Sequence, residues 1–376
     1  MDRQASWIDR TDALESALSG IGKGPLAIDT EADSLHHYPE KVCLIQLSFE
    51  GRDYLIDPLA KLSLEPLADR LADRSIVKIL HGADYDVRML HRGFGLTFAG
   101  LFDTMIAARI VGETRFGLAA LLERHFDIAM NKKFQRADWS TRPLTPEMAR
   151  YAVMDTHYLI RLREKLLGRL DELGRRDWAA EEFERLEQIR WVPRTPADDG
   201  FRRVKGAGKL DRRKLAVLRE LWALREAHAR RLDRPPFRVI HDERLIELVE
   251  RLPQRMIDLE GLDRLPRPWR QGRGAGELLA AIRTGLAVQA EDWPVRSKGG
   301  RTRSPRKTPD ERLLAIREHR DKIAEELGLE PSLVGPRAVL EQIVERQKAG
   351  KDPAATPELR RWQWDLLAPA AEQTAG

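Results

Sequence analysis

The sequence has few residues that bind soft metals or form covalent cross-links. Its 376 residues include one cysteine, Cys43, and nine histidines. A single thiol excludes an intrachain disulfide framework, and the absence of a His/Cys cluster argues against a structural zinc site. Cys43 lies in the apolar run VCLIQL, which is typical of a small buried core residue.

Long hydrophobic runs are also missing. No apolar run approaches the roughly 20 residues that a membrane-spanning helix requires. The first residues, MDRQASWIDR, lack the apolar segment of a secretory signal. We therefore expect a cytoplasmic protein that does not bind membranes.

Charge is abundant, at 33% of residues, but it is unevenly distributed. Residues 1–192 carry 27 Lys and Arg against 31 Asp and Glu, whereas residues 193–376 carry 38 against 29. The basic second half suits a polyanionic partner, although a merely solubilising surface would look the same.

The length predicts two or three domains, and the first half alternates between strand-like and helix-like segments. Runs of alternating or β-branched apolar residues predict strands at 25–31, 41–49, 52–57 and 76–80. Helical periodicity predicts helices at 64–73, 84–91, 103–111, 117–126 and 146–173. This order predicts an α/β domain over residues 1–192.

Two stretches rich in Pro, Gly and charge interrupt the second half. We predict linkers at 193–209 and 291–309, the second of them strongly basic. The segments between and after them, 210–290 and 310–376, have helical periodicity throughout and are predicted to be two all-α domains.

Acidic residues follow the first predicted strand, in the triplet Asp29-Thr30-Glu31. Residues i and i+2 of a strand point to the same face, so both carboxylates enter one pocket. Carboxylate oxygens are the ligands that hard divalent cations prefer. With 60 acids in the chain, such a pair also arises by chance on a surface.

Two further patterns extend the acidic set. Asp86 follows the strand at 76–80, in the turn or in the first turn of the next helix. Tyr151 and Asp155 are spaced i, i+4 and share one helix face. Taken singly, Asp86 could be a helix N-cap, and Tyr151 with Asp155 an ordinary hydrogen-bonded pair.

Together and in this order, the motifs resemble the Tyr subclass of the DEDD exonuclease superfamily. The stretch FQRADWSTRPLTPEMARYAVMDTHYL (134–159) is similar to the ribonuclease D signature, as are HGADYD (81–86) and FDT (102–104). The resemblance runs from about residue 26 to 159. It implies a ribonuclease H-like 3′–5′ exonuclease fold, with a mixed sheet flanked by helices.

The resemblance also implies roles for five residues. Asp29, Glu31, Asp86 and Asp155 would hold two divalent ions, Mg²⁺ or Mn²⁺, and Tyr151 would orient the attacking water. Two such ions supply the nucleophile, the charge neutralisation and the leaving-group help that phosphodiester hydrolysis needs. The pKa of free tyrosine, near 10, suits a hydrogen-bonding role better than that of a base.

Substrate contacts are implied at two places. The residues after the first acids, Leu35 and His36 followed by His37 and Tyr38, would pack on the terminal nucleotide, unless they form an ordinary polar loop. Lys132, Gln135 and Arg142 of the signature stretch would touch phosphate. Trp139 in that stretch is expected to be a packing anchor.

The second half resembles a helical module shared by RecQ-type helicases and ribonuclease D, the HRDC domain. The text LAVLRELWALREAHARRLDRPPFRVIHDERLIEL, closed by GELLAAIRTGL, carries this resemblance over 210–290. Residues 310–376 look like a second, divergent copy.

The sequence therefore predicts a metal-dependent 3′–5′ exoribonuclease. Its substrate would be RNA with a single-stranded 3′ end, implied by the family to be tRNA precursors, and the enzyme would be a monomer. Two alternatives stay open: the same active site acting on single-stranded DNA in repair, and a catalytically idle RNA-binding scaffold. The scaffold is disfavoured because all five active-site positions hold the expected residue types.

Overall fold

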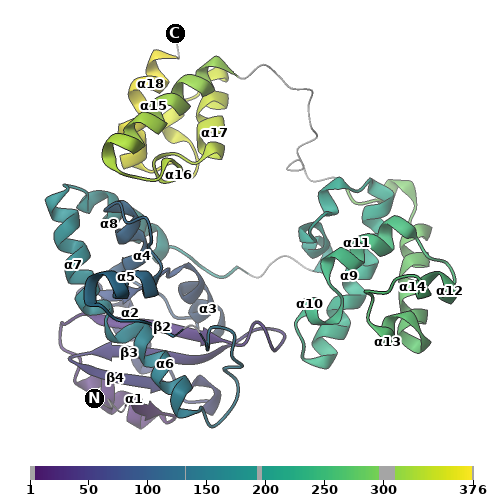
Figure 1. The fold of residues 1–376 in the computed structure, drawn as a ribbon, viewed down its shortest axis with the longest axis horizontal. Coiled ribbons are helices and arrows are strands. Elements are labelled where there is room, and N and C mark those ends of the chain that lie inside the picture. Colours follow the sequence, from purple (N-terminus) through teal and green to yellow (C-terminus); the bar gives the residue numbers. More distant parts are fainter. Residues whose placement is uncertain (1–4, 132, 193–196, 296–309, 375–376) are drawn as a thin grey trace. The chain divides into compact units, whose positions relative to one another are not determined.

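The structure is a computed structural model that describes residues 5–131, 133–192, 197–295 and 310–374 (Figure 1). These residues form two compact units. The first unit takes the residues up to 32, those from 41 to 191 and those from 310 onward. The second takes residues 33–40 and those from 192 to 295. Each unit has a hydrophobic core of its own.

The first unit contains a six-stranded mixed sheet in the order β1-β4-β3-β2-β5-β6. Strands β2, β3 and β4 form an antiparallel meander, whereas β1 pairs with β4, β5 with β2 and β6 with β5 in parallel. The strands are β1 Ser6–Ile8, β2 Leu26–Ala32, β3 Val42–Phe49, β4 Arg52–Ile56, β5 Lys78–Leu80 and β6 Leu101–Asp103. β1 and β6 were not predicted, because three residues are too few to show a period of two.

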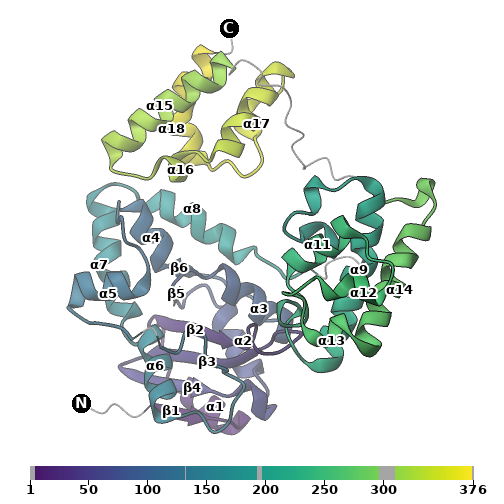
Figure 2. The ribbon, with the colours of Figure 1, turned by 45° about the vertical axis from the view of Figure 1, so that its right-hand side comes forward.

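Helices cover both faces of this sheet (Figure 2). All eight residues of β3 are buried, as expected of a central strand with helices on both sides. The helices are α1 Thr11–Ser19, α2 Glu65–Ala72, α3 Asp84–Phe94, α4 Thr104–Ile110, α5 Leu118–Phe126, α6 Pro146–His157, α7 Leu159–Glu172 and α8 Arg176–Glu187.

The single helix predicted over 146–173 is wrong, because the structure has two helices, α6 and α7, that meet at Tyr158. This residue ends α6 and caps α7, with φ −100° and ψ −4°. Leucines stay buried along α7 at helical spacing, so the periodicity in the sequence continues past the break. Neither Pro nor Gly marks the junction, and the sequence therefore gave no sign of it.

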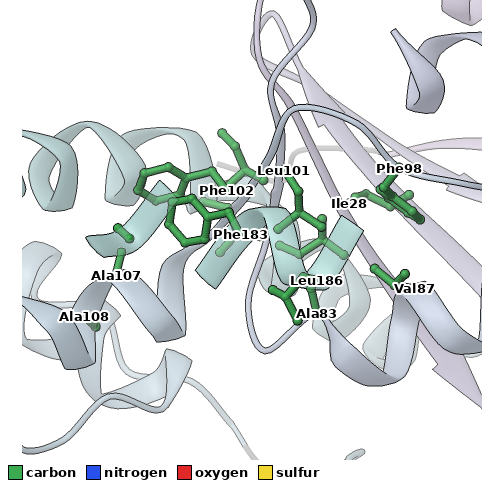
Figure 3. Close-up of a cluster of buried hydrophobic side chains, with 14 of the residues drawn as sticks. Ile28, Ala83, Val87, Phe98, Leu101, Phe102, Ala107, Ala108, Phe183 and Leu186 are labelled. Atoms are coloured by element: carbon green, nitrogen blue, oxygen red, sulfur yellow. The ribbon is translucent and has the colours of Figure 1, made fainter. Parts of the chain in front are cut away.

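A buried apolar cluster joins α8 to the edge of the sheet (Figure 3). Leu101 and Phe102 of β6 meet Phe183 and Leu186 of α8, and the rings of Phe102 and Phe183 lie 4.8 Å apart. These contacts hold α8 in a fixed position against the edge of the sheet.

The last helices of the chain pack on the other side of α8, within the same unit. The Trp178 ring stacks on that of Trp362 at 4.9 Å. Arg360 pairs with the buried Glu182 at 2.8 Å, and Glu181 accepts a hydrogen bond from the backbone N–H of Arg361 at 2.7 Å. The helices are α15 Glu311–Leu327, α16 Pro331–Val334, α17 Arg337–Lys348 and α18 Arg361–Gln373.

The second unit is all-helical apart from one segment contributed from far earlier in the chain, residues 33–40. Its longest helices, α9 and α14, pack along each other. The helices are α9 Arg212–Leu232, α10 Pro236–Val239, α11 Asp242–Arg251, α12 Met256–Glu260, α13 Arg267–Arg270 and α14 Gly272–Ala287. Among the described residues, no helix is both long and apolar enough to span a bilayer.

Candidate active site

Strand β2 carries the first two acids, between its middle and its end. Asp29 and Glu31 are two residues apart on this strand and so share a face of the sheet. The antiparallel register places Asp29 opposite Gln46 and Glu31 opposite Leu44 of β3. The register shifts between Glu31 and Ala32, where the strand ends. The two carboxylates therefore stand on a rigid interior strand, Asp29 at its middle and Glu31 one residue before its end.

Helix α6 crosses the same face and brings Tyr151 and Asp155. It packs on β2, β3 and β4. Its N-terminus is capped by the Thr145 hydroxyl, which accepts a hydrogen bond from the N–H of Met148 at 3.2 Å. Pro146 in the first turn suits this start, because its missing N–H would have no helical partner there.

A polar network fixes the other end of α6 to the sheet. The Ser48 hydroxyl lies 2.7 Å from that of Thr156 and donates to Asp53 at 2.6 Å. Asp53 in turn contacts the His157 ring nitrogen Nδ1 at 2.8 Å. Because Thr156 and His157 directly follow Asp155, this network sets the height of the Asp155 carboxylate above the sheet.

Helix α3 supplies the fourth acid, Asp86, in its first turn. The Thr30 hydroxyl donates to the Asp86 carboxylate at 2.5 Å. Thr30 alternates with Asp29 and Glu31 along β2, so it points to the opposite face of the strand. Asp86 thus reaches the end of β2 from the side opposite α6.

Three of the predicted acids converge on one point. Carboxylate oxygens of Asp29, Glu31 and Asp155 all lie within 4.8 Å of one another. They open into a cavity of about 350 Å³, together with Tyr151. The remaining lining residues are His81, Gly117, Leu118, Ala119, Ala120, Met130, Asn131 and Gln135.

The carboxylates are strongly coupled through burial and mutual repulsion. Burial and the neighbouring Asp86, Asp155 and Glu31 raise the pKa of Asp29 well above its ordinary value. Burial, followed by repulsion from Asp155 and Asp86, raises the pKa of Glu31 to about 9. Burial and Asp86 raise the pKa of Asp155 to about 7.

The fourth acid and the phenol are perturbed in the same direction. Burial raises the pKa of Asp86 to about 6, against the hydrogen bond from Thr30, which lowers it. The pKa of Tyr151 is raised by burial and then by the three clustered carboxylates, while a hydrogen bond with Gln135 opposes the rise. Tyr151 therefore stays protonated at neutral pH and can act only as a hydrogen-bonding group.

The donor set fits a hard divalent cation. All the converging ligands are carboxylate oxygens, which Mg²⁺ and Mn²⁺ prefer. Several buried carboxylates this close together cannot all ionise unless a positive charge lies among them. Asp29, Glu31 and Asp155 would hold one such ion, and Asp86 lies near enough to Asp29 and Asp155 to interact electrostatically with both.

The residues predicted to contact substrate in and next to the signature stretch differ in where the structure places them. Gln135 lines the acidic cavity, whereas Lys132 lies outside the described residues. Arg142 pairs with Asp57 through two bonds of 2.8 and 2.7 Å and donates to the Cys43 carbonyl oxygen at 2.6 Å. These bonds direct its guanidinium toward the sheet, so we leave Arg142 out of the proposed substrate contacts.

The residues after the first acids belong to the second unit. Leu35 is 37% exposed there, and the backbone N–H of His36 donates to the Asp33 carbonyl oxygen at 2.8 Å. Beside them, His37 contacts Asp233, the residue that follows α9, at 2.7 Å, and the Tyr38 hydroxyl donates to Glu226 of α9. The predicted nucleotide contacts of Leu35 and His36 stay predictions.

Sequence reasoning missed several lining residues. His81 directly follows β5 and begins the HGADYD motif that contains Asp86, and Asn131 lies three residues before the signature stretch 134–159, so adjacency to the motifs could have pointed to both. The first turn of α5, which also lines the cavity, carries only Leu and Ala and gave no chemical signal. Trp139 is 1% exposed and packs beside Tyr151 at 5.9 Å, in agreement with its predicted role as an anchor.

A second cavity, of about 680 Å³, adjoins the acidic one. The two share Met130, Asn131 and Tyr151 in their walls. Its lining is largely apolar, and its charged members are Lys133, Arg150, Asp53 and Glu147, of which Arg150 pairs with Glu147 at 3.2 Å. It therefore offers mainly apolar surface beside the carboxylates.

Comparison with known proteins identifies the two kinds of domain. Residues 5–171 match the family described as 3′–5′ exonuclease, and residues 214–282 match the HRDC domain. The predicted fold class, a mixed-sheet exonuclease domain followed by an HRDC-type helical domain, is therefore confirmed. Residues 310–374 are not covered by either match, so their origin as a second copy stays a prediction.

Comparison with individual proteins then narrows the family assignment. The chain is 32% identical over 350 residues to a ribonuclease D of Pseudomonas paraeruginosa, covering 92% of this chain and 90% of that protein. It is 33% identical over 272 residues to the yeast exosome complex exonuclease RRP6, but spans only 37% of that protein's length. The fold resembles the crystal structure of Escherichia coli RNase D with a TM-score of 0.74 at 26% identity, covering 99% and 98% of the two chains. The chain therefore belongs to the ribonuclease D family of 3′–5′ exonucleases.

Proposed function

We propose that this protein is a metal-dependent 3′–5′ exoribonuclease that removes nucleotides one at a time from single-stranded RNA ends and releases 5′-mononucleotides. The observation that carries the proposal is the convergence of Asp29, Glu31 and Asp155 within 4.8 Å, with Tyr151 in the wall of the same cavity. All five predicted catalytic positions hold residues suited to this chemistry, which disfavours an idle scaffold.

The proposed metal ligands are Asp29, Glu31, Asp86 and Asp155, which would hold two Mg²⁺ or Mn²⁺ ions. Such ions activate water and neutralise the charge that develops on the phosphate. The carboxylates come from β2, α3 and α6, three elements that are separately anchored in the core. Their positions are therefore set before any ligand binds, and preorganisation of this kind lowers the cost of reaching the transition state.

Tyr151 is proposed to orient the attacking water. Its raised pKa keeps the hydroxyl protonated, so it can donate one hydrogen bond and accept another. Gln135 interacts with the same hydroxyl and restricts its orientation. Together they would aim the water, whereas the acids control its ionisation.

The surroundings of the acids support an anionic polymer as substrate. The first turn of α5 lines the acidic cavity, and the N-terminus of a helix attracts phosphate through its N–H groups. The adjoining cavity, with its apolar lining and Lys133, could receive the bases of the next nucleotides of a single strand. The relatives' names, ribonuclease D and exosome exonuclease, favour RNA over DNA.

We keep the domain boundaries predicted from the sequence as part of this proposal. The catalytic domain would span 1–192 and the HRDC-like domain 210–290, with a second helical domain at 310–376. The basic second half would bring the strand to the active site, and tRNA precursors with single-stranded 3′ ends are the proposed natural substrates. An RNA 3′ end of defined sequence is the appropriate first probe.

The test is a time course with a 5′-labelled single-stranded RNA and Mg²⁺ or Mn²⁺, with a matched DNA alongside. Wild type should produce a metal-dependent ladder that shortens from the 3′ end, and Asp29→Ala and Asp155→Ala should lose at least about 10³-fold in rate. Asp84→Ala is the matched control, because Asp84 is an exposed acid on α3 that pairs with Arg88.

Each outcome of this assay bears on one part of the proposal. Full activity of the Asp29 and Asp155 variants would mean that the site is misassigned. Equal rates on RNA and DNA would move the substrate to single-stranded nucleic acid in general. Tight RNA binding by wild type without any cleavage would support the scaffold instead.

A further inference from the structure

Gln46 lies at the centre of β3, directly opposite Asp29 of β2 and opposite Leu55 of β4. Facing residues of an antiparallel pair have Cβ atoms about 4.5–5.5 Å apart and point to the same face of the sheet. Gln46 therefore shares the face of Asp29 and Glu31, which α6 covers. It is completely buried, with 0% of its surface exposed.

The neighbours of Gln46 along β3 define its surroundings. On one side, Leu44 belongs to an apolar cluster with Leu55 and with Ala152 of α6. On the other, the Ser48 hydroxyl meets that of Thr156 at 2.7 Å. Gln46 is thus a lone amide beneath α6, between an apolar layer and a polar pair, in the stretch of α6 that carries Asp155.

Gln46 Nε2 and Oε1 form no hydrogen bond with any other residue that the structure describes. An unsatisfied buried amide destabilises a protein, and an apolar side chain of similar shape would avoid that cost. A buried amide without a partner, on the strand position that faces the proposed metal ligands, indicates a functional role rather than a packing role.

We propose that Gln46 is a positioning residue for the metal site, and that its Nε2 donates a hydrogen bond to the Asp29 carboxylate in the cation-bound state. A carboxylate has more acceptor sites than a single cation uses, so Asp29 can bind metal and accept this bond together. Groups that hydrogen-bond to metal-ligating carboxylates fix their orientation. The inference rests on the proposed metal-dependent function.

Glutamine suits this position better than any charged donor. A lysine or arginine would neutralise Asp29 permanently and compete with the cation. A second carboxylate would add to the repulsion among Asp29, Glu31 and Asp155. The neutral amide orients the acid without changing the charge of the site.

The test compares the full-length Gln46→Met protein with wild type, because methionine keeps the length of the side chain and removes its N–H donor. Mn²⁺ and Mg²⁺ binding to the metal-free protein is measured by titration calorimetry, with thermal melting of the same samples. Gln46→Met should weaken cation binding about 10- to 100-fold. Its metal-free melting temperature should stay equal or rise, since an unsatisfied amide has been removed.

Gln363→Met is the matched control. Gln363 is also buried, at 3% exposed, but its amide donates to the Leu333 carbonyl oxygen at 2.7 Å and accepts from the backbone N–H of Arg360 at 3.0 Å. This variant should melt at a lower temperature and bind cations as wild type does. The opposite responses of the two variants would separate positioning from structural support.

Two results would overturn the inference. One is a Gln46→Met protein that binds cations with the affinity of wild type. The other comes from wild type alone: of the Gln side-chain amides protected from solvent exchange in its NMR spectrum, none shifts when Mg²⁺ is added. This second measurement holds even if the variant does not fold. If wild type itself binds no cation, the proposed function fails first.

Discussion

Cation binding by this protein should be coupled to the release of protons. In the metal-free state, burial and mutual repulsion raise the pKa of Glu31 to about 9 and that of Asp155 to about 7. They raise the pKa of Asp86 to about 6 and that of Asp29 well above its ordinary value. A carboxylate must lose its proton before it can bind a metal ion, so affinity should rise with pH.

The number of protons follows from these pKa values. At pH 7, Glu31 is almost fully protonated, Asp155 is about half protonated and Asp86 about one-tenth. Loading the site at pH 7 should therefore release roughly one and a half protons from these three groups, and the raised pKa of Asp29 adds to that release. Because the slope of log affinity against pH equals the number released, binding should tighten roughly 100-fold or more between pH 6 and 7.

Titration calorimetry of Mg²⁺ or Mn²⁺ into the metal-free protein, in buffers of different ionisation enthalpy, counts these protons directly. The Asp155→Asn variant should release fewer protons than wild type. A site that releases less than one proton and whose affinity is constant from pH 6 to 8 would refute the electrostatic argument. It would mean that the carboxylates are already ionised in the metal-free protein.

The same carboxylates predict an unusual pH dependence of stability. Their pKa values are raised in the folded state, so the folded protein holds more protons than the unfolded chain above about pH 4. The stabilisation is complete below that pH and is lost as pH rises through about 6, 7 and 9, the pKa values of Asp86, Asp155 and Glu31. The metal-free protein should therefore melt at progressively lower temperature from pH 5 to 9, and Mg²⁺ should restore most stability at the alkaline end.

Tyr151→Phe should lower kcat about 100-fold or more while leaving cation affinity within about threefold, because the hydroxyl orients water and is no ligand; an equal loss of affinity would show that it holds the metal. Glu31→Gln should raise the metal-free melting temperature at pH 8 by about 5 °C or more, since folding at that pH no longer has to protonate the carboxylate that is ionised in the unfolded chain, and should abolish tight cation binding. Arg360→Ala should cost about 3 kcal/mol in chemical denaturation, because it leaves the buried Glu182 unpaired, against less than about 1 kcal/mol for the exposed Arg337→Ala. If both arginine variants lost the same free energy of unfolding, the ion pair of Arg360 with Glu182 would stabilise the protein no more than an exposed pair does.

The acidic site could be predicted because its geometry is local. A period of two along β2 places Asp29 beside Glu31, and the spacing of four on α6 places Tyr151 beside Asp155. Both patterns are properties of single elements, and a sequence records them directly. The order of the motifs along the chain then pointed to a known family.

The contacts that sequence reasoning could not reach are all between distant segments. The loop after β2 binds α9 through Tyr38 and Glu226, 188 residues apart, and Glu182 pairs with Arg360 across 178 residues. No local pattern distinguishes a tyrosine that binds another helix from one that meets substrate. Gln46 was hidden in an apolar run, where only the register with Asp29 reveals its importance.

The arrangement of polar groups around the site explains how a repulsive cluster is kept in place. The hydrogen bonds that hold α6 on the sheet are made by residues next to Asp155 and not by Asp155 itself: Ser48 bonds with Thr156, and Asp53 with His157. Because these bonds satisfy other groups, they leave the oxygens of Asp155 directed into the cavity. Among the described residues that line the acidic cavity there is no arginine or lysine, so a divalent ion relieves the repulsion where such a side chain would have cancelled it. We therefore expect the metal-free protein to be less stable than the metal-bound protein, because its carboxylates repel one another until a metal ion lies between them.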